Sequence, residues 1–275
     1  MDKSRRSERM VVITQLLLQK PRSLFALSFF SKIFGVAKST ISEDLNILRA
    51  TSEHWGFGEL VTVSGAAGGV KFTPNLSRLE RKEFVEYLRE ELSKPERILP
   101  GGYLYMADLI YNPQVVGKAG KLLATIFKDI QPDYIVTVET KGIPLALMTA
   151  GAFNVPLVII RANNKVTEGS ALSINYVSGS TRRIQSMSLA RRGLPTESKV
   201  IIIDDFMKAG GTARGMHDLM QEFRAEVLAT AVMVATGEPG EKLISNYISI
   251  LDLISVDTVN RRVIVEPGKW YAALS

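Results

Sequence analysis

The stretch VIIIDDFMKAGGT at residues 200–212 decides the fold. Four branched aliphatic residues are followed at once by Asp204 and Asp205, and then by a turn that ends in Gly-Gly-Thr. An apolar run without polar alternation is typical of a strand in a parallel sheet that is covered on both faces. Such sheets bind ligands beyond the carboxyl ends of their strands. The stretch therefore predicts a buried strand with a ligand site at its end.

The residues after the strand indicate which ligand the site takes. Adjacent ionised carboxylates only accept hydrogen bonds, which suits a vicinal diol or a Mg²⁺ ion. The turn at 208–212 opens a predicted helix, so its backbone N–H groups and the helix dipole favour an anion, and the Thr212 hydroxyl adds a donor. A diol binder beside a phosphate cradle describes a site for ribose 5-phosphate. A strand-end turn with solvated acids is the alternative interpretation.

Helices and strands alternate around this stretch. Apolar periodicity predicts helices at 114–127, 142–153 and 212–223, and strands at 133–138, 155–161, 199–205 and 227–235. The second domain is therefore predicted to be α/β and doubly wound, with a parallel sheet. Residues 162–192, rich in Ser, Asn and Arg, interrupt the alternation. A segment of that length predicts a lid, a pair of additional strands or disorder.

The N-terminal part of the chain has another pattern. Periodicity and helix-stop residues predict helices at 5–19, 27–34 and 36–50, with a capping box at Thr40 and Glu43. Two short strands near 60–63 and 70–73 flank a loop of Gly and Ala, which is typical of a hairpin.

Three helices followed by a hairpin is the order of a winged helix, in which the third helix enters the major groove and the wing contacts the backbone or minor groove. A small helical domain that only mediates dimerisation is the alternative. We predict a winged helix at 1–74 and an α/β domain at 75–275, which begins with a connecting helix.

Charge favours a polyanionic partner. The net charge of the chain is +6, while residues 1–74 alone have a net charge of +4 and residues 161–192 one of +5. Two basic segments thus outweigh an almost neutral remainder, which points to nucleic acid or a phosphorylated metabolite.

Other classes of protein and site are excluded or disfavoured. The chain has no cysteine, so disulfides and thiolate chemistry are excluded. Its two histidines lie far apart, and we assign no metal site. The longest apolar stretch, 227–236, is shorter than the roughly 20 residues of a membrane span. We expect no membrane association and a cytoplasmic location, with the protein on the nucleoid when it binds DNA.

Several motifs resemble those of a known enzyme family. DDFMKAGGT (204–212) resembles the phosphoribosyl pyrophosphate (PRPP) motif of the type I phosphoribosyltransferases, and VETKGIP (138–144) resembles their pyrophosphate loop. In that family a non-proline cis peptide is common in this loop. Residues 162–192 stand where the family has a flexible loop that closes over the substrate.

The whole chain resembles the purine operon regulators of Gram-positive bacteria. A winged helix is followed in order by the motifs PERILPGGY, TKGIPLA, NKVTEGS, INYVSGS and DDFMKAGGT. The resemblance implies a dimeric transcription factor that senses PRPP, binds double-stranded operator DNA at paired purine boxes, and needs no cofactor. Guanosine tetraphosphate or other purine nucleotides are further ligands that the family suggests. The resemblance also allows Mg²⁺ to bind together with PRPP.

The resemblance also assigns residues. Asp204 and Asp205 are expected to bind the ribose diol of PRPP and residues 208–212 its 5-phosphate. The effector-binding set is Tyr103, Thr140, Lys141, Gly142, Asp204, Asp205, Phe206, Lys208, Ala209, Gly210, Gly211 and Thr212. The DNA-binding set is Arg5, Arg6, Lys38, Ser39, Thr40, Ser42, Arg49, Gly68, Gly69 and Lys71.

One departure from the enzymes separates a sensor from a catalyst. Many transferases of 6-oxopurines carry an acid in the turn that assists proton transfer, and Lys208 occupies that position here. A lysine can bind phosphate but is a poor substitute for that base. Adenine-type enzymes lack this acid too, so an active phosphoribosyltransferase stays the alternative, and an interaction module is a third. We assign no catalytic residue and predict a regulator.

Overall fold

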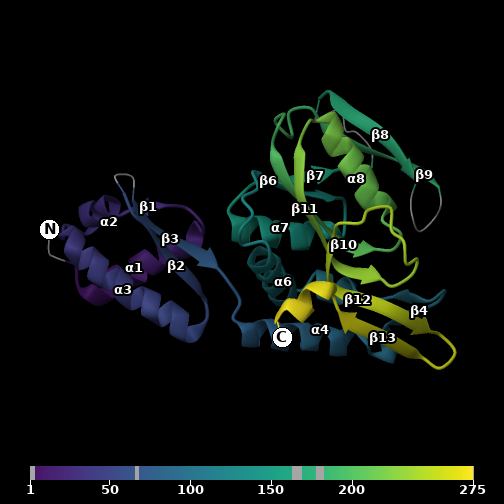
Figure 1. Ribbon diagram of the computed structural model, residues 1–275, viewed down its shortest axis with the longest axis horizontal. Coiled ribbons are helices and arrows are strands. Elements are labelled where there is room, and N and C mark those ends of the chain that lie inside the picture. The colour runs from purple at the N-terminus through teal and green to yellow at the C-terminus, as the bar shows by residue number, and fades with distance from the viewer. Residues whose placement is uncertain (1–3, 66–67, 163–168, 178–182, 275) are drawn as a thin grey trace.

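A small N-terminal domain and a larger α/β domain make up the chain (Figure 1). The computed structural model describes residues 4–65, 68–162, 169–177 and 183–274. The N-terminal domain contains α1 (Arg6–Gln19), β1 (Phe25–Ala26), α2 (Leu27–Phe34), α3 (Lys38–Trp55), β2 (Gly58–Val63) and β3 (Gly69–Pro74). The strands form an antiparallel sheet in the order β1-β3-β2. This arrangement confirms the predicted winged helix.

Helix α3 packs through an apolar stripe on one of its faces. Ile41 and Leu45 are buried in one cluster with Ile13 of α1 and Phe72 of the hairpin. The predicted capping box is wrong, because α3 begins two residues before Thr40, with Ala37 at the N-cap. The helix can begin there without a side-chain cap because the packing of its apolar stripe stabilises it.

A buried ion pair joins α1 to α3. Arg9 donates from Nε to Oδ2 of Asp44 at 2.7 Å and from Nη2 to Oδ1 at 3.2 Å, and both side chains are buried. Arg6 lies on the exposed side of Asp44, with Nε 3.2 Å from Oδ1, and also reaches Glu43. A bidentate ion pair of this kind fixes the angle between the two helices as well as their separation.

The α/β domain follows. Its helices are α4 (Arg78–Leu92), α5 (Ala107–Ile110), α6 (Pro113–Ile126), α7 (Gly142–Phe153) and α8 (Gly211–Glu222), with short 3-10 turns at Pro95–Arg97 and Lys269–Leu274. Its strands are β4 (Ile98–Leu99), β5 (Tyr103–Leu104), β6 (Tyr134–Val138), β7 (Leu157–Ile160), β8 (Ala171–Val177), β9 (Ile184–Ala190), β10 (Lys199–Met207), β11 (Glu226–Thr236), β12 (Ile248–Asp257) and β13 (Arg262–Pro267).

The central sheet has the strand order β13-β12-β11-β10-β6-β7 and is parallel except for β13. Alternate residues of β10 enter different cores. Ile201 and Ile203 pack with α6 and α7, whereas Val200 and Ile202 pack with α8. Because helices cover both faces of the sheet (Figure 1), every one of these side chains is apolar. The doubly wound α/β prediction is confirmed.

Two features of the α/β domain differ from the predicted series. The series does not end at 227–235, because β12 and β13 extend the sheet. Polar residues in β12 obscure the strand pattern, yet Ser249 donates to Asp252 at 2.6 Å, so this pair is satisfied within the sheet. Within 162–192, β8 and β9 form an antiparallel ribbon against α8. The remaining parts of that segment, 163–168 and 178–182, lie outside the described residues.

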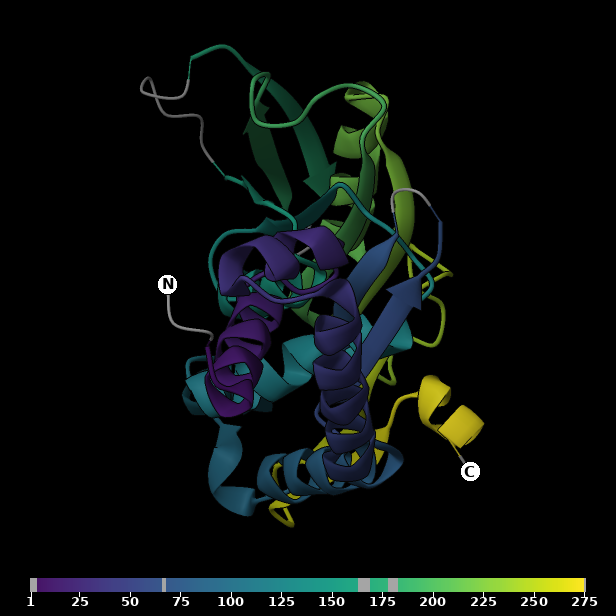
Figure 2. The ribbon, with the colours of Figure 1, turned by 90° about the vertical axis from the view of Figure 1, so that its left-hand side faces the viewer.

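Figure 2 shows the winged helix in front of the α/β domain, and Figure 1 shows α4 along the lower side of the α/β domain. Helix α4 starts with a capping box in which Ser77 and Glu80 each accept a backbone N–H. It therefore begins at a fixed point just after the hairpin. In the part of the chain that the structure describes, no helix is both long and apolar enough to cross a membrane.

The buried ion pair predicts a stability difference between neighbouring acids of α3. Asp44→Ala should destabilise the winged helix by about 3–5 kcal/mol, because it leaves the buried Arg9 charge uncompensated. Denaturant unfolding followed by the fluorescence of Trp55, in a Trp270→Phe background, measures the winged helix. The matched control is Glu43→Ala, whose exposed pair with Arg6 should contribute less than about 1 kcal/mol. Similar losses in the two variants would contradict this role for Asp44.

Candidate functional site

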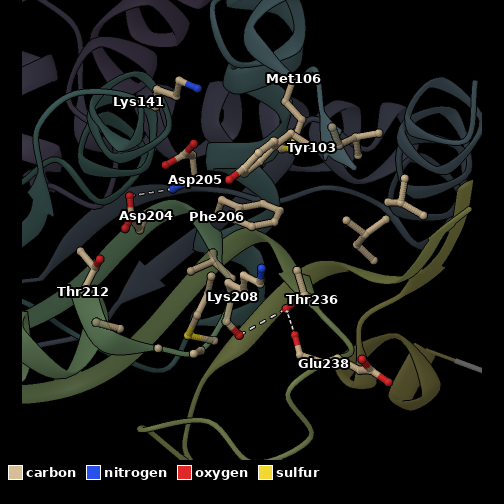
Figure 3. A pocket seen from close by; sticks show the side chains of 18 of the residues that line it. Tyr103, Met106, Lys141, Asp204, Asp205, Phe206, Lys208, Thr212, Thr236 and Glu238 are labelled. Atoms are coloured by element: carbon tan, nitrogen blue, oxygen red, sulfur yellow. Dashed lines mark hydrogen bonds between the residues drawn. The ribbon is translucent and has the colours of Figure 1, made fainter. Parts of the chain in front are cut away.

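A cavity of about 660 Å³ lies at the carboxyl ends of β10 and β11 (Figure 3). Its walls come from the turn after β10, from the loop before α7, and from β5 and β12. Ten of the twelve predicted effector residues line it: Tyr103, Lys141, Asp204, Asp205, Phe206, Lys208, Ala209, Gly210, Gly211 and Thr212. Thr140 and Gly142 are not among the lining residues.

The two aspartates occupy different environments at the base of this cavity. Asp204 is buried, and its Oδ1 accepts the backbone N–H of Asp205 at 2.9 Å. Burial, reinforced by the neighbouring Asp205 charge, holds the pKa of Asp204 well above its ordinary value. Burial also raises the pKa of Asp205, against which the Lys141 charge acts. Both carboxyl groups are therefore costly to ionise without a partner, and a ligand with paired hydroxyl donors would supply one.

The turn at 208–212 presents a helix N-terminus to the cavity. Gly210 is the N-cap of α8 with φ 80, a left-handed conformation that glycine adopts without a steric cost. The loop between β11 and β12 supports the turn, since the Leu243 N–H donates to Ala209 O at 2.9 Å. Helix α8 begins at Gly211, so its first N–H groups belong to residues of the cavity wall. An N-terminus of this kind favours an anion.

The loop before α7 closes another side. A Cβ atom at Gly142 would lie 2.6 Å from Asp204 Oδ1 and would also overlap with Thr137 Oγ1. Glycine is therefore required if α7 is to start this close to the aspartates. Gly142 does not line the cavity, but it lets α7 start beside the aspartates. Lys141, which does line the cavity, is the N-cap of α7. The Glu139–Thr140 peptide bond is cis, as the resemblance implied.

The sequence analysis missed part of the cavity wall. These lining residues are Gly101, Gly102, Leu104, Met106, Ile110, Met207, Ala213, Val232, Thr236, Glu238 and Leu253–Val256. Thr236 donates to Lys208 O at 3.2 Å, which links the strand β11 to the turn (Figure 3). The turn Pro100-Gly101-Gly102 before Tyr103 is a signal that could have pointed to the β5 wall. Nothing in the pattern of β12 marks it as a wall.

The predicted DNA-contacting residues of α3 are accessible in part. Lys38, Ser39 and Ser42 are exposed, whereas Thr40 is half-buried. Arg49 is used within the domain, because it donates to Leu60 O at 3.1 Å and to the Thr62 hydroxyl of β2. Arg49 therefore holds the hairpin against α3, which leaves fewer of its donors for DNA.

The remaining residues of the predicted DNA-binding set are likewise either accessible or used within the domain. Arg5 is exposed at the start of α1, whereas Arg6 pairs with the acids of α3. Gly68 and Gly69 shape the hairpin, since a Cβ atom at either would overlap with backbone atoms. Lys71 is half-buried on β3. Among the residues that the structure describes, no group of three or more His, Asp or Glu could hold a metal ion.

Fold and site together define a class of protein, a winged-helix DNA-binding domain joined to a phosphoribosyltransferase-type domain. The family models agree with both parts. Residues 5–74 match the model described as "Bacterial purine repressor, N-terminal", and residues 106–267 match "Phosphoribosyl transferase domain".

The chain belongs to the family of purine biosynthesis transcriptional regulators. It is 50% identical to the purine biosynthesis transcriptional repressor PurR of Bacillus subtilis, over 98% of this chain and 94% of the relative. It is 40% identical to the purine biosynthesis transcriptional activator PurR of Lactococcus lactis, over 97% of this chain and 98% of the relative. The phosphoribosyltransferase fold therefore serves a regulator here, as the sequence predicted, and not an enzyme.

Solved structures show the same fold for the larger domain alone. Adenine phosphoribosyltransferase of Thermoanaerobacter pseudethanolicus has a TM-score of 0.53 and 17% identity, and covers 61% of this chain and 99% of that chain. The enzyme of Saccharomyces cerevisiae has a TM-score of 0.53 and 21% identity, over 61% of this chain and 98% of that chain.

The raised pKa of Asp204 predicts a pH-dependent gain in stability on neutralisation. A carboxyl whose pKa is higher in the folded than in the unfolded protein costs free energy when ionised, so Asp204→Asn should stabilise the protein at neutral pH, on the order of 1 kcal/mol. The gain should shrink as the pH falls through the folded pKa, and vanish below the ordinary value of 3.8. Thermal unfolding from neutral to acid pH measures the gain.

Asp257→Asn provides a control of opposite sign. Hydrogen bonds from Asn260 lower the pKa of Asp257. Its ionised form is favoured in the folded protein, so this variant should lose stability at neutral pH, and the loss should shrink as the pH falls. A destabilising Asp204→Asn at neutral pH would show that the Asp204 charge is compensated.

Proposed function

We propose that the chain binds purine-gene operator DNA through its winged helix, and that PRPP bound in the cavity after β10 modulates this binding. One observation carries the proposal. The diol-type aspartates, the anion-binding turn at 208–212 and Lys141 line one cavity, in a chain whose N-terminal domain matches that of bacterial purine repressors. Repression or activation then depends on the position of the operator, and the two relatives carry those two names.

Each chemical group of PRPP has a partner of matching chemistry in the cavity. Asp204 and Asp205 accept hydrogen bonds from the ribose diol, and the N-terminus of α8 binds the 5-phosphate. The loop at 140–142 takes the pyrophosphate, for which Lys141 supplies a cation. Tyr103 and Phe206 form an apolar wall beside the sugar, and Figure 3 shows Asp205 between Lys141 and Phe206. Lys208, exposed at the turn, adds a second cation.

The same cavity also suits ligands other than PRPP, and it suits Mg²⁺ bound together with PRPP. Guanosine tetraphosphate and other purine nucleotides carry the same phosphate chemistry and compete with PRPP in this proposal. No resident cofactor is required. The paired carboxylates suit Mg²⁺ brought in with PRPP, and calorimetric titration of PRPP with and without Mg²⁺ distinguishes the two modes.

We propose that the protein acts in the cytoplasm as a homodimer. One winged helix covers only a half-site of DNA, so a dimer suits operators with paired purine boxes. Each protomer places an α3 face in the major groove, with Ser39 and Ser42 near base edges. Lys38 and Arg5 contact phosphates, since both are exposed cations at helix starts.

Removal of the aspartates should separate DNA binding from the response to PRPP. Asp204→Ala combined with Asp205→Ala removes the diol acceptors but leaves the winged helix unchanged. The double variant should bind operator DNA at least as tightly as the wild type, since two negative charges are lost, while PRPP no longer changes its affinity. Footprinting on purine-gene promoter DNA, with and without PRPP, measures both properties. A PRPP response equal to that of the wild type would place the effector elsewhere.

The salt dependence of DNA binding tests the predicted phosphate contact of Lys38. Each phosphate contact adds about 0.9 to the slope of log K against log salt. Lys38→Ala should reduce the slope by about that amount per operator half-site and weaken binding to all sequences alike. Lys118→Ala, which removes an exposed lysine from α6, is the matched control and should leave the slope unchanged. An unchanged slope in Lys38→Ala would exclude the contact.

A further inference from the structure

A contact centred on Arg22 joins the winged helix to the α/β domain. Arg22 lies in the turn between α1 and β1 and adopts φ 60, which few residues other than glycine do. Its backbone N–H donates to Phe72 O of β3 at 2.7 Å. The backbone of Arg22 is therefore fixed to the wing, and its side chain follows any movement of the winged helix.

The Arg22 side chain reaches into the other domain. Its Nη2 donates to Ala124 O at 2.9 Å, in the last turn of α6, and its Nη1 donates to Ile130 O at 3.3 Å, in the loop that follows α6. Its Cζ lies 4.0 Å from the ring centroid of Phe153, the last residue of α7. The carboxyl end of a helix carries partial negative charge and a ring face attracts a cation, so both surroundings suit the guanidinium.

A second bond joins the same turn to the end of α7. Asn154 Nδ2 donates to Ser23 Oγ at 2.9 Å, directly beside the Arg22 contact. Helix α7 thus ends against two successive residues of the winged helix. A change in the position of this end would act on the turn through both contacts.

Helix α7 has its other end at the cavity. Its first turn lies against Asp204, because a side chain at Gly142 would overlap with the Asp204 carboxylate. Twelve residues span about 18 Å along a helix axis. Helix α6 packs tightly beside α7, since a Cβ atom at Gly120 would lie 2.7 Å from Met148 C. The two helices therefore shift together, and Arg22 holds the carboxyl ends of both.

We propose that Arg22 is the positioning residue through which the ligand state of the cavity reaches the winged helix. This inference rests on the proposed function, because it takes the loop at 140–142 as the ligand's contact with α7. Ligand phosphates attract the Lys141 cation and so shift the start of α7. The rigid helix transmits this shift to Phe153 and Asn154. The guanidinium then exchanges carbonyl partners, and the winged helix turns with it.

The contact of Arg22 is suited to such an exchange. Its Nε is buried and, among the described residues, has no hydrogen-bond acceptor. A third carbonyl, Lys128 O, lies 3.5 Å from Nη1, at the outer limit of a hydrogen bond. An unsatisfied buried donor costs free energy. The observed set of Arg22 hydrogen bonds is therefore only slightly more stable than the alternative sets. Two arrangements of similar free energy are what a ligand with modest differential affinity can select between.

The test compares Arg22→Lys with Arg224→Lys. Lysine keeps the charge but lacks the forked donors of arginine. Arg224 is an exposed arginine that also adopts a left-handed backbone, with φ 54, so its variant controls for backbone strain. Operator affinity is measured with and without saturating PRPP, and PRPP affinity is measured separately by calorimetry. The ratio of the two operator affinities is the coupling, typically about 5- to 150-fold in allosteric proteins.

Arg22→Lys should bring this ratio at least about threefold closer to one. Its PRPP affinity in the absence of DNA should stay within about twofold of the wild type. Arg224→Lys should keep the wild-type ratio. Asn154→Gly, which removes the bond to Ser23 but suits the observed φ of 57, should shift the ratio in the same direction as Arg22→Lys. It keeps the inference testable if Arg22→Lys does not fold.

The opposite results are equally distinct. A wild-type ratio in Arg22→Lys and Asn154→Gly overturns the inference, while the PRPP response of the wild type still supports the proposed function. Equal weakening of DNA binding with and without PRPP assigns Arg22 a structural role only, and also overturns the inference. A wild type that binds operator DNA but shows no PRPP response overturns the proposed function itself, and the inference with it.

Discussion

The start of helix α7 lies so close to the end of strand β10 that only glycine fits at position 142. A Cβ atom there would overlap with both Asp204 and Thr137. This close approach brings the loop with Lys141 and the aspartates to one cavity, although they lie more than sixty residues apart in the sequence. It also fixes the direction of α7, whose far end reaches Arg22. The cavity and its link to the winged helix depend on the same contact.

Electrostatics make this cavity costly to maintain. Two neighbouring carboxyls are held largely out of water, and burial raises the pKa of each. A protein selected only for stability would place amides there. Desolvated acceptors beside a helix N-terminus instead favour a ligand that brings hydroxyl donors and phosphates together. The stability lost in the empty protein is thus a source of ligand selectivity, as is common where local stability is given up at a binding site.

Local chemistry made much of this site predictable from sequence. The apolar run of β10, the paired acids and the Gly-Gly-Thr turn are consecutive in the sequence, and together they predicted the strand, the position of the cavity and the start of the next helix. The β12 wall was not predictable, because Ser249 and Asp252 interrupt the apolar pattern of a strand in which these two polar side chains bond to each other.

Long-range pairing limits the prediction of the DNA face. Arg6 and Arg49 are basic residues in basic segments, and nothing local reveals that Asp44 and the hairpin use their donors. The helix α3 likewise begins before its capping-type residues, because tertiary packing determines where it starts. Sequence patterns therefore located the helix that is predicted to face DNA, whereas the structure distinguishes its accessible residues from those that hold the domain together.

A regulator and an enzyme make different demands on one fold. Many transferases of 6-oxopurines have an acid at the turn after β10 and adenine-type enzymes do not, and at this turn the chain has the cation Lys208. A regulator needs a mechanical connection from the ligand to a second domain. The contacts of Arg22 and Ser23 are of that kind, since they exist only because a winged helix precedes the α/β domain. Under the proposed function, conversion of such a fold into a regulator requires little change in how it binds phosphate and ribose, but it does require a rigid helix that joins the ligand site to a second domain.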